Sequence, residues 1–194
     1  MRVSTLFVSV GILLSQFTLS LPVKADDEVA TKRAFRAGAY AIDITPEEFP
    51  VLGNGGMYSR TADKVVDRLF ARCLVLDDGA AQIAIVVVDS CMLPRRLLDE
   101  AKDLAAQATE IPTSRMLISA THTQSAPAAM GCLGTDRDEK YAAFLPTRIA
   151  RGIQLAQRNL EPAQIGWSKS REPEKVLNRI CMMKLVTDRM KQYI

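Results

Sequence analysis

The sequence predicts an α/β fold, with a mixed β-sheet of about four to six strands flanked by at least two helices. Residues 82–122 run from an apolar stretch through a helical stripe to a second apolar stretch, which is the order strand, helix, strand. Apolar residues also recur at every fourth position across 141–160, as in an amphipathic helix. The composition, 48% hydrophobic and 24% charged, is that of a globular domain.

The first 25 residues have the features of a secretory signal peptide. Arg2 supplies the positive start, residues 3–21 carry no charge, and Val23-Lys24-Ala25 has the small-x-small form of a cleavage site. We therefore expect cleavage after Ala25 and a secreted or periplasmic protein. An uncleaved membrane anchor is the alternative. No later segment is long enough to span a bilayer.

Residues 26–63 predict an exposed arm, a short strand and a long loop. The arm covers residues 26–37 and the strand 38–44, which ends at Thr45-Pro46 because proline cannot donate to a β-ladder. Residues 47–63 are predicted to form the loop. Its Gly53-Asn54-Gly55-Gly56 run allows a ligand to approach the backbone closely, although a plain surface loop fits the run equally well.

Residues 71–122 predict three further strands, the first over 71–76, and a crossover helix. The run 82–89 is apolar on both faces, as expected of a central strand that helices cover. Pro94 is predicted to open the helix, and the next strand leads into His122. A crossover of this kind makes the two strands parallel. Asp89 and His122 then both lie at carboxyl ends of strands, where ligands bind in such sheets.

The last third of the chain predicts a loop over 128–138 and a second helix over 141–160. Pro146 and Gly152 interrupt this helix, so we expect a bend or a late start. Residues 165–167 are predicted to form a short strand.

Charge and cysteine content narrow the class of protein. Arg2 and Lys24 account for two of the three net positive charges, so the mature chain is nearly neutral, which argues against a nucleic-acid partner. The four cysteines allow three full disulfide pairings. For Cys73 and Cys91, which lie in or next to apolar runs, buried free thiols are the favoured interpretation.

Candidate site residues follow from their positions and chemistry. His122 is the only histidine, and a neutral imidazole at a strand end can be a zinc ligand or can bond to the backbone. Asp89 could orient that imidazole or cap the following loop. Asp43 is expected to form a turn, and Arg72 to be a paired structural charge. Ser125 beside His122 raises the possibility of a serine hydrolase.

Several motifs appear in a fixed order. They are Gly38…Asp43-Ile44-Thr45-Pro46, Gly53, Leu69-Phe70-Ala71-Arg72, Val86-Val87-Val88-Asp89, Thr121-His122-Thr123-Gln124-Ser125-Ala126-Pro127 and Asn178-Arg179. In this succession the chain resembles the amino-terminal part of the neutral/alkaline non-lysosomal ceramidase family, over about residues 37–180. The resemblance implies an incomplete amino-terminal portion of a larger catalytic domain over 38–180, followed by a divergent tail over 181–194.

The resemblance also implies a zinc-dependent hydrolase that cleaves the N-acyl amide of ceramide or a related lipid. His122 matches a zinc ligand of the family. Gln124 stands where the family has a second catalytic histidine, and a glutamine cannot transfer protons. Gly53 and Asn54 are expected to border the substrate cleft.

The remaining zinc ligands of the family come from later sequence. We therefore expect this chain to be a truncated member that holds zinc poorly and is weakly active or inactive alone. The alternative is a non-catalytic exported fragment that binds lipid or a partner.

Overall fold

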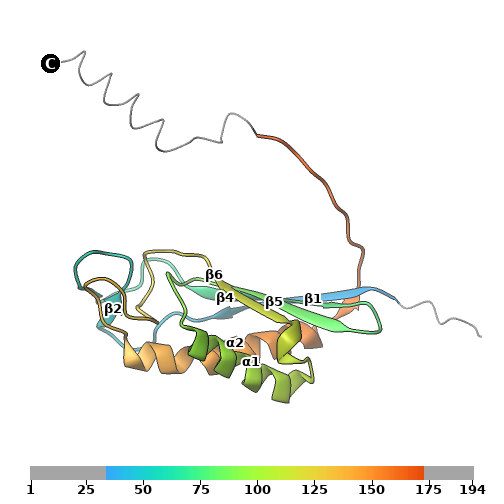
Figure 1. Cartoon of the computed structure of the whole chain (residues 1–194), viewed down its shortest axis with the longest axis horizontal. Helices are drawn as coiled ribbons and strands as arrows, with labels where there is room; N and C mark the ends of the chain where they lie inside the picture. Colours follow the sequence, from blue (N-terminus) through green and yellow to red (C-terminus); the bar gives the residue numbers. More distant parts are fainter. Residues whose placement is uncertain (1–33, 173–194) are drawn as a thin grey trace, which may run out of the picture. The chain divides into compact units, whose positions relative to one another are not determined.

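The computed structural model describes residues 34–172, and its main element is a mixed five-stranded sheet (Figure 1). The predicted signal peptide, most of the predicted arm, Cys181 and the predicted tail lie outside the described residues. The strand order is β6-β5-β4-β1-β7. The strands are β1 (Arg36–Asp43), β4 (Phe70–Asp77), β5 (Gln82–Val88), β6 (Met116–Ala120) and β7 (Glu161–Pro162). The predicted α/β class and mixed sheet are confirmed.

Strand pairing follows the predicted crossover. β1 pairs antiparallel with β4, β4 antiparallel with β5, and β5 parallel with β6. β1 begins two residues earlier than predicted, because Arg36 and Ala37 pair with Asp77 and Leu76 of β4. These two residues therefore belong to the sheet and not to an exposed arm.

Helix α1 (Arg95–Thr109) makes the crossover between β5 and β6. It begins directly after Pro94, as predicted, and buries Leu97, Ala101 and Ala105. A single 3-10 turn, η1 (Thr113–Arg115), then leads into β6.

Helix α2 (Glu139–Arg158) runs through Pro146 without interruption, so the predicted late start is wrong. Asp138 caps its first turn by accepting a hydrogen bond from the Tyr141 amide at 3.0 Å. Proline removes one backbone donor from the helix. The fully buried Leu145 and Ile149 lie on either side of Pro146 along the core-facing stripe. The packing of this stripe outweighs the lost bond.

Gly152 allows α2 to approach the sheet closely. A Cβ atom at this position would lie 2.7 Å from Cys73 Sγ and 2.8 Å from Ile42 Cγ2. The predicted interruption at Gly152 is therefore a contact between helix and sheet.

Helices α1 and α2 pack on the same face of the sheet (Figure 1), so within residues 34–172 helices cover one face of β5, whereas the sequence predicts that they cover both. Alternate β5 residues, such as Val86 and Val88, are buried against the helices. Between them, apolar side chains point to the opposite face. We call this the open sheet face, and it is formed by Leu74, Ile83, Val87 and Leu117, which are all exposed within the described part of the chain.

Two loop predictions need correction. Residues 47–63, predicted as loop, contain the short strands β2 (Val51–Gly53) and β3 (Arg60–Ala62), which pair with each other. Strands of three residues are too short to show an alternating pattern. Residues 165–167 form no strand. Instead β7 adds to the end of β1 through the pairs Arg36–Pro162 and Ala37–Glu161.

The cysteines in the described part of the chain are free thiols, as favoured from sequence. Cys73 and Cys91 are buried, and Cys132 is half-buried. Burial raises the pKa of the Cys73 thiol to about 12.

Candidate functional site

A cleft of about 660 Å³ lies between two loop segments at one end of the sheet. Residues 45–69, which include the β2–β3 sheet, supply one wall, and residues 123–127 after β6 supply the other. Asp89 joins them from the end of β5. The cleft therefore lies where β5 and β6 end, as the sheet topology predicts.

Backbone hydrogen bonds hold the two walls together. Gly53 forms an antiparallel bridge with Pro127, next to which the Asn54 amide donates to the Ala126 carbonyl at 3.2 Å. The Ala128 amide donates to the Leu52 carbonyl at 2.7 Å. These bonds make the segment after β6 an extra partner of strand β2.

Of the two residues predicted to border the cleft, Gly53 and Asn54, only Gly53 is among the lining residues. Gly53 lines the cleft. The Asn54 side chain is buried beneath it, where Nδ2 donates to the Met130 carbonyl at 2.8 Å and Oδ1 accepts from the Gly55 amide at 2.6 Å. Asn54 thus connects the glycine-rich run to the 128–138 loop and is not among the lining residues.

Arg60 is a cleft residue that sequence reasoning missed. Its guanidinium donates to the Asn54 carbonyl at 2.8 Å and also to the Gln124 carbonyl. One cation thereby connects both walls. Nothing in the local sequence indicates this role, because both acceptors are backbone atoms.

Gln124 lines the cleft, and its side chain lies over Gly55. Gly55 has a φ of 86°, and a Cβ atom there would lie only 2.5 Å from Gln124 Cγ. Glycine is required at position 55 for both reasons. The glycine-rich run therefore does allow a close approach, although what approaches is a side chain of the same protein.

Asp89 lines the cleft, but its carboxylate is engaged by strand β4. Oδ2 accepts from the Phe70 amide at 3.0 Å, and the Arg72 guanidinium donates to both oxygens at 2.8 Å. Arg72 also lies over the Phe70 ring, 5.6 Å from its centroid. Arg72 is thus the paired charge that the sequence predicted. No hydrogen bond joins Asp89 to His122 within residues 34–172.

His122 is exposed, with a φ of 61°, and directly precedes the lining residue Thr123. The left-handed region of backbone space is several-fold enriched in histidine. Two hydrogen bonds of the same kind hold the loop. The Thr123 amide donates to the Thr121 hydroxyl at 3.4 Å, and the Ser125 amide donates to the Thr123 hydroxyl at 3.4 Å. Ser125 lines the cleft, but among the described residues it has no hydrogen bond to His122.

The described residues do not make up a zinc site. A catalytic zinc takes three protein ligands. Within residues 34–172 no three His, Cys, Asp or Glu side chains converge, and the carboxylate of Asp89 at the end of β5 is bound by Arg72. His122 remains a single donor at the predicted metal position.

Asp43 ends β1 and forms the predicted turn. Its carboxylate accepts from the Thr45 amide at 2.8 Å and pairs with Arg68. The bonds from Thr45, with Arg68 adding to them, lower the pKa of Asp43 below its usual value. The turn directs residues 45–50 away from the sheet to begin the cleft wall.

These observations define an α/β protein with a cleft at the ends of its strands. Comparison with known proteins narrows this class to a particular fold. Solved structures with a similar fold include a neutral ceramidase from Pseudomonas aeruginosa, with a TM-score of 0.60 and 24% identity over 66% of this chain. A ceramidase complexed with C2 gives a TM-score of 0.57 and 26% identity over the same share. The chain spans 22% of the length of each.

The described part of the chain therefore has the fold of part of a ceramidase, and the resemblance to the amino-terminal part of that family is confirmed as a likeness of fold. No family model matches the sequence, and no curated protein matches it. Within residues 34–172, neither helix combines the length and hydropathy of a bilayer span.

Proposed function

We propose that this chain is the substrate-binding part of a ceramidase-like amide hydrolase, and that its cleft takes a lipid amide such as ceramide. The observation that supports this most is the fold match to two ceramidases. A second support is the position of the cleft, at the carboxyl ends of the parallel pair β5 and β6.

The lining of the cleft suits a molecule with hydrocarbon chains around one polar group. Apolar side chains form much of the 45–69 wall; they are Phe49, Val51, Val65, Val66 and Leu69. The facing wall includes Thr123, Gln124 and Ser125, whose side chains carry two hydroxyls and one amide. A glutamine amide both donates and accepts, so it can pair with the carbonyl and the N–H of a substrate amide. We infer that Gln124 orients the amide and transfers no proton.

His122 matches a zinc ligand of the family that the chain resembles, and a zinc ion held there would polarise the substrate carbonyl. The described donor set does not fit a catalytic zinc, since it offers one imidazole. What we propose for these residues is binding and orientation of the amide.

The same donor set favours a second candidate, a non-catalytic lipid-binding protein. The two candidates share the cleft and its ligand, and they differ in turnover. We further propose that the protein is exported, on the support of residues 1–25. Amino-terminal sequencing of the protein from its host should give Asp26 as the first residue, whereas an intact Met1 would contradict export by cleavage.

The test is to titrate the purified chain with a fluorescent short-chain N-acyl sphingoid amide, with and without added zinc. We expect saturable binding. Gln124→Ala should weaken it about two- to tenfold, the range for one lost hydrogen bond. Gln107→Ala, an exposed glutamine on α1, is the matched control and should bind normally. Absence of saturable binding, or equal losses in both variants, would refute the proposal. Hydrolysis of the amide would exclude the non-catalytic candidate.

A further inference from the structure

We propose that the loops beside the cleft dock on a lipid surface, by inserting Met57, Tyr58 and Leu133 into electrically neutral lipid. These three side chains are called the apolar rim below. The inference rests on the proposed function, because it names the surface from which a lipid amide would enter the cleft.

The apolar rim is unusually exposed for its composition. Tyr58 is 86% exposed, Met57 71% and Leu133 65%. An apolar residue exposed singly needs no explanation, but several together mark an interaction site. Tyrosine is also enriched at membrane interfaces, because its ring is apolar and its hydroxyl remains in the headgroup region.

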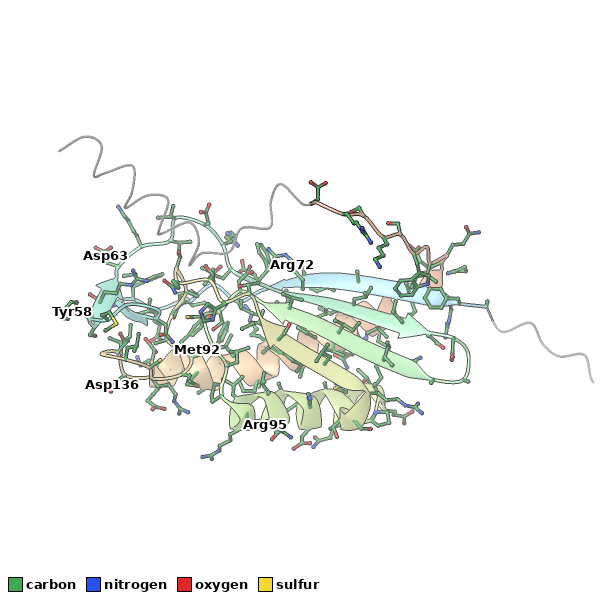
Figure 2. The ribbon with its side chains drawn as sticks, turned by 45° about the horizontal axis from the view of Figure 1, so that its top comes forward. Tyr58, Asp63, Arg72, Met92, Arg95 and Asp136 are labelled. Atoms are coloured by element: carbon green, nitrogen blue, oxygen red, sulfur yellow. The ribbon has the colours of Figure 1, made fainter. Side chains whose placement is uncertain are left out.

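Two separate loops are held together to form this rim. Met57 and Tyr58 lie in the turn between β2 and β3, whereas Leu133 lies in the 128–138 loop. A Cβ atom on Gly134 would lie 2.5 Å from the Met57 carbonyl oxygen, so the two backbones touch. Figure 2 shows Tyr58 and Asp136, one from each loop, at the same end of the molecule. The rim is therefore one surface.

The rim is continuous with the cleft. Strand β3, which begins two residues after Tyr58, contributes Arg60, Thr61 and Ala62 to the cleft lining. Val66 further along the same wall is also largely exposed and lines the cleft. Strand β3 thus connects the rim to the wall of the proposed amide site.

The charges around the rim indicate which kind of lipid surface it would bind. Residues 57–68 and 130–138 together carry four basic and four acidic side chains, which are Arg60, Lys64, Arg68, Arg137, Asp63, Asp67, Asp136 and Asp138. A surface that binds anionic lipid or nucleic acid has an excess of basic residues. The balance here fits zwitterionic lipid, and binding should be insensitive to salt because burial of apolar side chains drives it.

The test uses the full chain with neutral phosphatidylcholine vesicles that contain a photoactivatable phosphatidylcholine. Labelling is mapped by mass spectrometry, so contacts made by the apolar leader are distinguished from those made by the rim. We expect labels on the peptides that contain Met57, Tyr58 and Leu133, and none on the peptide that contains Leu117. Leu117 is the matched control, because it is 61% exposed but lies on the open sheet face.

In the double variant Met57→Ser, Tyr58→Ser, rim labelling should fall about tenfold or more, as expected for two exposed apolar side chains that no longer enter lipid. Leu117→Ser should leave it unchanged, and so should 1 M salt. Rim labels that are absent, equal to those at Leu117 or abolished by salt would overturn the proposal. A dimer that dissociates in the double variant would also overturn it, in favour of a second copy of the chain.

The outcomes separate the two proposals. If rim labelling fails while the soluble short-chain amide still binds, only lipid docking is refuted. If rim labelling succeeds while no amide enters the cleft, the docking surface stands and the proposed function is refuted.

Discussion

The helix-covered core and the loop end that forms the cleft are built in different ways. In the core, buried apolar side chains of α1 and α2 pack on alternate residues of the sheet. At the loop end, polar side chains bond to backbone atoms of distant segments, as Asn54 does to Met130 and Arg60 to Gln124. Substitutions in the core should therefore act mainly on stability, whereas those at the loop end should act on stability and on the cleft together.

Thiol reactivity should show the largest difference between the two regions. Burial raises the pKa of Cys73 from 9.0 to about 12, which lowers its thiolate fraction about a thousandfold at pH 8. Half-buried Cys132 in the 128–138 loop should be alkylated by iodoacetamide in native buffer, and Cys73 only after unfolding. Peptide-resolved mass spectrometry measures both rates. Similar native rates would mean that the core opens as readily as the loop.

Removing core volume should have the next largest effect. Leu145 is fully buried in α2, so Leu145→Ala should lower the free energy of unfolding by about 2–5 kcal/mol. Leu117→Ala on the open sheet face should change it by less than about 0.5 kcal/mol. Guanidinium titration followed by circular dichroism gives both values. Equal losses would show that the open sheet face is covered in solution.

Asn54→Ala tests the polar connections of the loop end. It leaves the Met130 carbonyl without its buried donor and should cost about 1–3 kcal/mol of stability. It should also weaken lipid-amide binding, since Asn54 supports the glycine-rich wall. Asn159→Ala is the control: Asn159 also donates to a carbonyl, that of Ala39, but is exposed, so water can replace the bond. Normal amide binding by the Asn54 variant would show that the buried hydrogen bonds of Asn54 are not needed for the cleft to bind the amide.

The smallest effect should come from a carboxylate at the far end of the sheet. The Gly79 amide, with Gln82 and Arg36 adding to it, lowers the pKa of Asp77 below its ordinary 3.8. Asp77 therefore stabilises the fold above about pH 4, and this contribution is lost as the pH falls through the lowered pKa.

Asp77→Asn should thus cost about 1 kcal/mol at pH 7 and flatten the loss of stability in acid. Denaturant titrations between pH 3 and pH 7 measure the slope. An unchanged slope would contradict the assignment. Amide binding at pH 7 should be normal, because Asp77 is not among the residues that line the cleft.

The sequence was most informative where long apolar runs carried the signal. Residues 82–122 predicted the crossover and the parallel pair correctly, because a run of β-branched residues followed by a helical stripe has few other solutions. The ordered motifs predicted the ceramidase fold correctly, although each fragment alone is weak. The cleft position followed from the ends of β5 and β6, which Asp89 and His122 mark.

Other features could not be predicted for identifiable physical reasons. Strands β2 and β3 are too short to show periodicity. The continuity of α2 depends on packing around Pro146, and local propensity alone argues against it. The role of Arg60 depends on two backbone acceptors 6 and 64 positions away, which leave no pattern in the sequence. The apolar outer side of β5 predicted a second covering layer, and the described residues leave that side exposed.

The claim that the cleft takes a lipid amide is tested most directly by photolabelling the full chain with a photoreactive N-acyl sphingoid amide and mapping the modified residues. The structure predicts labels within 45–69 and 123–127, competed by the unmodified amide and reduced about tenfold by Val66→Asp, which places a charge in the apolar wall. Leu117→Asp should leave the labelling unchanged. Labels confined to the open sheet face, or cleft labels that the unmodified amide does not displace, would contradict the claim.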